Sequence, residues 1–176
     1  GMKPGKQFKI IQSLGHHIID PIPSLFTFEI KHPLINGLQG LSVPLAESSL
    51  IGTDIRCQGP MLITHWGLSG PAILRLSAWA AREIHAMSGP FEIGINWIPD
   101  VDNPQTALLA FKETHSKKLL TNSPALGLPK RLWQRLVGTV DVKPRMTWGG
   151  LRQDSLDQLC SILTQTRFKV SGKSRN

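Results

Sequence analysis

Residues suited to chemistry gather in one short segment, 64–71, which reads Thr-His-Trp-Gly-Leu-Ser-Gly-Pro. An apolar run precedes this segment, and Pro71 is typical of the first turn of a helix. We therefore expect a strand that leads into a helix N-terminus, where backbone N–H groups without intrahelical partners face outward. Because Gly67 and Gly70 permit close approach, the segment is suited to bind an anion or an electron-rich ring edge.

The same segment is compared with the nucleophile elbow of serine hydrolases. That elbow requires the spacing G-x-S-x-G, and here Leu68 or Pro71 breaks the spacing in either frame. Ser69 is therefore expected to cap the helix that follows. Two interpretations of His65 stay open. The first is structural, a hydrogen-bonded ring at a strand end. The second is functional, a proton donor or a contact to the edge of a ligand ring.

Metal and nucleotide motifs are absent from the sequence. The six histidines include no i, i+4 pair, and the cysteines at 57 and 160 form no CxxC motif, so no metal site is expected. No G-x-G-x-x-G follows a strand, and no GK[ST] loop is present. The chain alone therefore carries no nucleotide-binding fingerprint.

The chain is basic, with a formal net charge of +8. Residues 117–145 contain seven lysines and arginines against the single acid Asp141. Such a segment could bind nucleic acid, but its cations are not interleaved with exposed aromatic residues. A solvated helical face, or one that meets an acidic protein, is therefore favoured over nucleic acid.

Cysteine usage and hydropathy indicate the compartment. Two distant cysteines suit a reducing environment, and no run of eighteen apolar residues or signal segment is present. We expect a cytoplasmic protein without a membrane partner.

Apolar spacing predicts the order of elements. Residues 8–14 read as the tail of a helix that ends at Gly15. Short strands are expected at 18–19, 25–30, 41–45 and 61–63, then one helix from about 70 to 87 and a strand at 91–98. Three helices should follow, opened by Asn103-Pro104, by Pro129 and by an Asp154 cap, before a last strand at 167–171.

Five stretches, taken in order along the chain, resemble a known protein family. Thr64 to Leu74 is similar to the THxGLSGPAxL signature of the bacterial aminoacetone-oxidase-like flavoproteins, often labelled NAD(FAD)-utilising dehydrogenases. The other stretches are SLGH with PIPSL at 13–25, LQGLS at 38–42, LPKRL at 128–132 and FKVSG at 168–172. Their common order over nearly the whole chain makes the resemblance specific.

The resemblance implies an α+β fold with a particular domain organisation. In that family an FAD-binding Rossmann-like domain is split by an insertion, a barrel-like β-domain that carries an all-helical subdomain. This chain is expected to cover the insertion and little else. Residues 1–15 would be a tag remnant (Gly1-Met2) and a helix tail from the flavin domain, 16–98 plus 166–176 the barrel-like domain, and 99–165 the helical subdomain.

The resemblance also implies a function, the substrate- and cofactor-covering domain of an FAD-dependent oxidoreductase. FAD belongs to the full-length protein, and neither cofactor binding nor turnover is expected of this segment alone. The expected partners are the FAD-binding domain of the same polypeptide and a small-molecule substrate. The residues expected to face the flavin or the substrate are Thr64, His65, Trp66, Gly67, Leu68, Ser69 and Gly70. No catalytic residue is assigned, and the alternative is a non-catalytic module that binds nucleic acid or an acidic protein through its basic helices.

Overall fold

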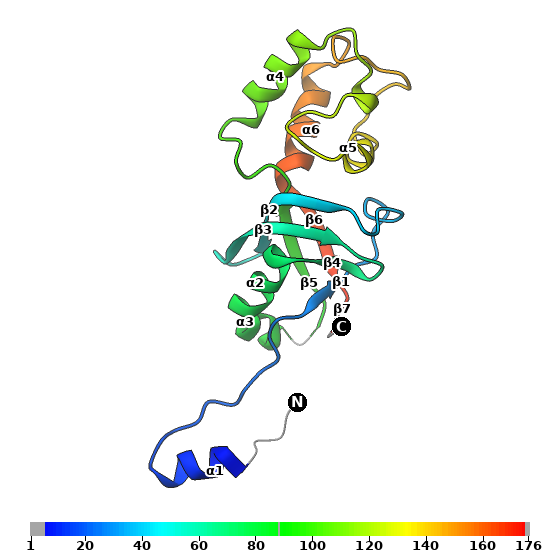
Figure 1. Cartoon of the computed structure of the whole chain (residues 1–176). Coiled ribbons are helices and arrows are strands. Elements are labelled where there is room, and N and C mark those ends of the chain that lie inside the picture. The colour runs from blue at the N-terminus through cyan, green and yellow to red at the C-terminus, as the bar shows by residue number, and fades with distance from the viewer. Residues whose placement is uncertain (1–5, 88, 175–176) are drawn as a thin grey trace.

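The computed structural model describes residues 6–87 and 89–174, and Figure 1 shows a β-sheet body with a helical part at one end. The mixed α+β class is confirmed, because an antiparallel sheet and several helices share one chain. Gly1 and Met2, expected to be a tag remnant, lie outside the described residues.

Seven strands of the described chain form one sheet, in the order β6-β5-β2-β3-β4-β1-β7, and every pair is antiparallel. The edge strands β6 and β7 are consecutive in sequence and are separated only by Ser171. The Ser171 N–H donates to the carbonyl of Glu29, at 2.9 Å. The chain therefore joins the two sheet edges and closes a barrel, which removes exposed edges. The strands are β1 (Thr27–Glu29), β2 (Ser42–Leu50), β3 (Arg56–Ile63), β4 (Gly67–Ser69), β5 (Phe91–Asn96), β6 (Thr166–Val170) and β7 (Gly172–Ser174).

Strand β3 shows why these segments form a barrel wall. Its residues alternate between exposed and buried along the whole strand, so that Cys57, Met61 and Ile63 enter the core. Its partner β2 carries a bulge between Val43 and Ala46, and Pro44, which has no N–H to donate, lies inside it.

One expected helix, 70–87, is two helices in the structure, α2 (Pro71–Trp79) and α3 (Ala81–Ala86). The prediction of a single helix was wrong at Ala80, which leaves helical geometry (φ −92°, ψ 16°). The turn keeps Ile84 in the core while α2 packs Ile73 and Leu76 against the barrel. Trp79, the last residue of α2, is 76% exposed.

The helical part holds α4 (Pro104–Thr114), the 3-10 turn η1 (Leu120–Asn122), α5 (Lys130–Val137) and α6 (Gln153–Gln165), which lie together at one end of the barrel (Figure 1). Asn103 caps α4 as predicted, since its side-chain oxygen accepts the Thr106 N–H at 3.0 Å. The predicted Asp154 cap is wrong. Helix α6 begins one residue earlier without a side-chain cap, and the Asp154 carboxylate lies 3.7 Å from Arg152.

Two tryptophans fill the centre of the helical part. Trp133 and Trp148 are fully buried, and their rings stack with centroids 5.6 Å apart. Each indole N–H donates to a main-chain carbonyl, that of Leu120 at 2.7 Å and that of Ser123 at 3.1 Å. This packing forms the inward face of α5, where Leu132, Trp133, Leu136 and Val137 are all buried.

The helical part is continuous with the barrel. Helix α6 runs directly into β6, and Trp97, just after β5, donates from its main chain to Leu163 and from its indole to Thr166, both at 2.8 Å. One buried core cluster spans both parts. The expected boundaries at 99 and 165 therefore stay a prediction.

The segment before the barrel contains α1 (Lys6–Ser13), and Gly15 after it has a φ of 86°, as the predicted helix tail requires. The strand expected at 18–19 is wrong, because residues 16–24 form no regular element. None of the described helices is long and apolar enough to cross a membrane.

Candidate functional site

The segment singled out by the sequence forms a tight turn between two strands. Thr64 donates its N–H to the Gly67 carbonyl at 2.8 Å, and its hydroxyl oxygen accepts the N–H groups of Trp66 at 3.2 Å and Gly67 at 3.1 Å. Strand β4 follows directly, so a third element lies between the predicted strand and helix. The turn holds His65 and Trp66 at the surface, and 58% of Trp66 is exposed.

The helix N-terminus behind this turn is closed. A Cβ at Gly70 would lie 2.8 Å from the Pro60 carbonyl oxygen, and a Cβ at Gly59 would lie 3.3 Å from the Ala72 nitrogen. The start of α2 is thus packed against the backbone of β3, and the prediction of outward-facing amides was wrong. Ser69 makes no cap, because its hydroxyl lies 3.1 Å from that of Thr27 on the neighbouring β1.

Gly67 and Leu68 serve to hold the turn in place. A Cβ at Gly67 would lie 2.2 Å from the Phe28 carbonyl oxygen and 2.5 Å from the Ile30 nitrogen. Leu68 is fully buried and pairs with Phe28. Of the seven predicted site residues, Thr64, His65 and Trp66 lie on the turn itself, before β4 begins.

Thr64 and His65 line a pocket of about 380 Å³ together with a loop that follows β1. His32 in this loop accepts the Leu34 N–H on Nδ1 at 3.2 Å, and its ring stands edge-on to Phe168, 5.1 Å between centroids. In its neutral form this ring therefore carries its proton on Nε2. None of the described residues that line the pocket carries a carboxylate; its walls are Ile30, Lys31, His32, Pro33, Ile35, Asn36, Gln39, Thr64 and His65.

Helix α5 supports the loop from the helical part. Arg131 donates to the carbonyl of Gly37, and Arg135 donates to that of Asn36 at 2.9 Å. The loop is also joined to the turn, since the Ile30 N–H donates to the Trp66 carbonyl at 2.8 Å. Sequence reasoning missed loop 30–39. The signal available was the polar run Lys31-His32-Pro33 directly after a predicted strand.

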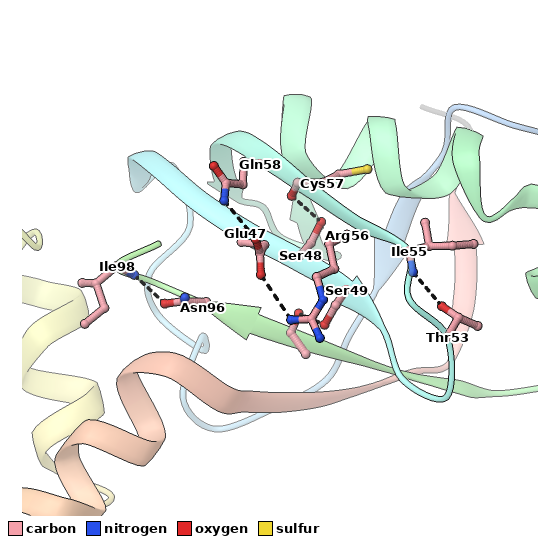
Figure 2. Close-up of polar contacts among 11 residues, drawn as sticks. Glu47, Ser48, Ser49, Thr53, Ile55, Arg56, Cys57, Gln58, Asn96 and Ile98 are labelled. Carbon is pink, nitrogen blue, oxygen red and sulfur yellow. Dashed lines mark hydrogen bonds and ion pairs between the residues drawn. The ribbon is translucent and has the colours of Figure 1, made fainter. Parts of the chain in front are cut away.

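A second polar cluster lies on the barrel wall (Figure 2). The carboxylate of Glu47 accepts from the Gln58 amide at 2.9 Å and lies 3.6 Å from the Arg56 guanidinium. Glu47 pairs with Gln58, and Ser49 with Arg56, in the β2–β3 ladder. The cluster therefore links neighbouring strands and supplies no free carboxylate for acid–base work.

The described residues include neither a cysteine with a lowered pKa nor a set of metal ligands. Burial raises the pKa of the Cys57 thiol, a shift that nearby Arg75 opposes, and burial also raises the pKa of Cys160. Both side chains therefore stay protonated near neutral pH. Within residues 6–87 and 89–174, no group of three His, Cys, Asp or Glu side chains could hold a metal ion.

Comparison with known proteins places this architecture in a family. Residues 22–175 match the family model described as "HI0933-like protein barrel and H2TH domain". The chain belongs to this HI0933-like family. The family lies within the FAD-dependent oxidoreductase superfamily, so the resemblance drawn from the sequence is confirmed at that level.

Two relatives of this HI0933-like chain carry the name "Ribosomal RNA dihydrouridine synthase". The protein from Escherichia coli is 32% identical over 169 residues, which cover 94% of this chain and 39% of the relative. The protein from Haemophilus influenzae is 29% identical over 128 residues, which cover 71% of this chain and 29% of the relative. The chain thus spans well under half the length of these relatives.

The described residues of this HI0933-like chain do not form the parallel β-α-β unit that holds a dinucleotide such as FAD. Its described strands are all antiparallel, which leaves no parallel β-α-β unit, and the start of α2 is closed by β3. The candidate ligand site is the open, polar pocket lined by Thr64, His65 and loop 30–39.

Proposed function

We propose that this chain is the substrate- and cofactor-covering domain of an FAD-dependent oxidoreductase, with the pocket at Thr64 and His65 turned toward the reaction centre. The single observation that carries the proposal is that Thr64, His65 and loop 30–39 form one pocket, braced by the barrel and by α5. Membership of a flavoprotein family supports it. The flavin, when bound by the complete protein, would supply the redox chemistry, while this chain shapes the pocket and excludes water.

The proposal assigns different roles to the predicted site residues. Thr64, His65 and Trp66 would face the flavin edge or the substrate. Gly67, Leu68, Ser69 and Gly70 would position that turn through the contacts with β1 and β3.

Substitution of His65 by alanine in the complete protein is expected to lower turnover or FAD affinity about 10-fold, the scale of one lost hydrogen bond. Ser69→Ala should have a smaller effect, because this hydroxyl meets Thr27 behind the turn. FAD titration and steady-state kinetics measure both. Unchanged values for His65→Ala would leave the turn with a structural role only.

A second candidate is binding of nucleic acid by the helical part, which the RNA-directed names of the two relatives favour. Three exposed cations, Lys117, Lys118 and Arg145, form what we call the basic tip. Their segments lie side by side, since Trp148 N–H donates to the Lys118 carbonyl at 2.9 Å and Leu119 bridges Thr147.

The cations of the basic tip are available to a partner. Among the described residues, the three side chains make no ion pair and no side-chain hydrogen bond. The helical part of a covering domain could thus hold an RNA backbone electrostatically. The small-molecule substrate expected from the sequence stays a prediction beside this candidate.

A further inference from the structure

We propose that a hollow on the outer wall of the barrel binds the phosphate group of a small phosphate monoester, held between Arg56 and Arg167. The hollow has a volume of about 200 Å³ and lies where β2, β3, β5, β6 and the end of α6 meet. It goes beyond the proposed function, because Arg56 and the Thr64 turn lie at opposite ends of β3. We call it the wall hollow, and its polar lining includes Glu47, Ser49, Arg56, Asn96, Gln165 and Arg167.

The register of four neighbouring strands brings the two arginines to the wall hollow. Ser49 pairs with Arg56 on one side and with Gly94 on the other, and Gly94 in turn pairs with Arg167. Because neighbouring strands lie about 4.8 Å apart, this row places the Cα atoms of the two arginines roughly 14 Å apart. Both side chains are on the outer face, since exposed and buried residues alternate along β3 and β6. The two long cationic side chains therefore flank a low point of the wall at Ser49 and Gly94.

Gly94 keeps the wall hollow open. A Cβ at this position would lie 2.8 Å from the Ser49 hydroxyl oxygen and 3.2 Å from the Cδ1 atom of Ile51. The Ser49 hydroxyl lies close over this residue and donates to the Gly94 carbonyl at 3.3 Å. A side chain at position 94 would therefore push Ser49 outward and fill the space that a ligand can use.

Glu47 orients Arg56 without using up its donors (Figure 2). The carboxylate lies 3.6 Å from the guanidinium, which holds the two charges together but is too long for a hydrogen bond. The other carboxylate oxygen accepts from the Gln58 amide at 2.9 Å, so Glu47 is itself held in place. The guanidinium N–H groups of Arg56 are thus available to a second acceptor.

Arg167 and two side-chain amides complete the set of donors. Within residues 6–87 and 89–174, the Arg167 side chain makes no ion pair and no hydrogen bond. The side-chain oxygen of Asn96 accepts the Ile98 N–H at 3.0 Å, which leaves its NH2 group for a ligand, and Gln165 adds a second amide from the end of α6. With two guanidinium groups against the single carboxylate of Glu47, these groups give the wall hollow a net positive charge.

This set of donors fits a phosphate monoester. A guanidinium group binds phosphate oxygens with two parallel N–H donors, and two such groups from different strands can share the three terminal oxygens of a monoester. A monoester also carries nearly two negative charges at neutral pH. A phosphodiester carries one charge and is substituted on two sides, so it should bind the wall hollow more weakly.

Lys169 provides a matched control on the same strand. It is an exposed cation two residues after Arg167, it pairs with Glu92 of β5, and it is not among the described residues that line the wall hollow. Replacing either cation with glutamine lowers the net charge of the protein equally. Only the replacement of Arg167 removes a donor from the wall hollow.

The test is an NMR titration of this chain, near neutral pH and at constant ionic strength, with glycerol 3-phosphate, inorganic phosphate and dimethyl phosphate. The backbone amide signals of Ser49, Gly94 and Gln165 should shift and saturate with glycerol 3-phosphate, with a Kd of about 1 mM, the scale of two charge-assisted hydrogen bonds. Inorganic phosphate should bind no more tightly than the monoester, and the diester dimethyl phosphate about 10-fold more weakly, because it lacks one charge and one terminal oxygen.

Variants locate the binding. Arg167→Gln should weaken the binding of glycerol 3-phosphate about 10-fold, the scale of one lost charge-assisted hydrogen bond, whereas Lys169→Gln should leave the Kd nearly unchanged. Gly94→Ala should also weaken binding, because its methyl group fills the wall hollow. Since Arg167 is exposed, an unchanged unfolding midpoint verifies that Arg167→Gln is folded.

Four outcomes would overturn the proposal: shifts that do not saturate, tighter binding of inorganic phosphate than of the monoester, equal affinity for dimethyl phosphate, or equal losses for Arg167→Gln and Lys169→Gln. The titration contains no flavin, so its outcome is independent of the flavin reaction. If the effect of His65→Ala on turnover holds while the phosphate titration fails, the covering function stands and only the phosphate site is lost.

Discussion

Replacing Gly67 with alanine is expected to destabilise the protein by about 3 kcal/mol, the upper end of the usual range for overpacking. The new Cβ would lie 2.2 Å from the Phe28 carbonyl oxygen and 2.5 Å from the Ile30 nitrogen, both backbone atoms. Neither atom can move without separating β1 from β4, which pair at Phe28–Leu68 and Glu29–Gly67. The φ of 151° adds strain for any residue with a side chain.

Gly52→Ala is the matched control for this prediction. Gly52 has a positive φ of 86°, but a Cβ there would meet nothing within 4 Å. Its cost should be about 1 kcal/mol, from backbone strain alone. Urea denaturation of the two variants measures the difference, and similar free energies of unfolding would mean that the contact of the turn with β1 is not tight.

Removing the basic tip, by the triple substitution of Lys117, Lys118 and Arg145 with alanine, is expected to weaken binding of RNA strongly at low salt. The plot of log affinity against log salt concentration has a negative slope. For three lost phosphate contacts on a single strand, this slope should become less steep by about 2. The loss should be similar for different RNA sequences, because phosphate contacts carry no base information. Titrations at several salt concentrations measure both quantities.

An equal loss of charge elsewhere provides the control. Lys9, Arg82 and Lys169 are exposed cations on α1, α3 and β6. Their triple alanine variant should change the salt slope little. If both triple variants lose the same affinity for RNA, the net charge of the protein attracts the RNA, and the basic tip is not a specific RNA interface. If neither loses affinity, the helical part does not contact RNA.

Local patterns were sufficient to predict much of the fold. The Asn103-Pro104 cap predicted the start of α4, and Pro129 predicted that of α5, because helix-start signals act within one or two turns. The strand at Phe91–Asn96 was also predicted from its alternation.

Features that depend on distant contacts were missed. Strand β4 has only three residues, too few for an alternation, and is defined by its pairing with β1 and β3. The start of α2 looked open in the sequence, and only its packing on Gly59 closes it. The local rule for a proline-started helix says nothing about which strand covers it.

Only one wall of the candidate site was predicted, because the other wall also depends on contacts between residues far apart in sequence. The sequence singled out Thr64 and His65, but the opposite wall of their pocket comes from loop 30–39, about thirty residues away. Arg131 and Arg135, which hold that loop, are nearly a hundred residues away, and no local pattern connects them to Asn36.

The central claim is that the turn at His65 faces the flavin-containing cleft of the complete protein. Its most direct test is the rate at which diethyl pyrocarbonate modifies individual histidines, read by mass spectrometry in flavin-loaded and flavin-free protein. His85 on α3 is also exposed and serves as the internal control. We expect bound flavin to slow modification of His65 and to leave that of His85 unchanged. Equal rates for His65 in the two forms would contradict the account.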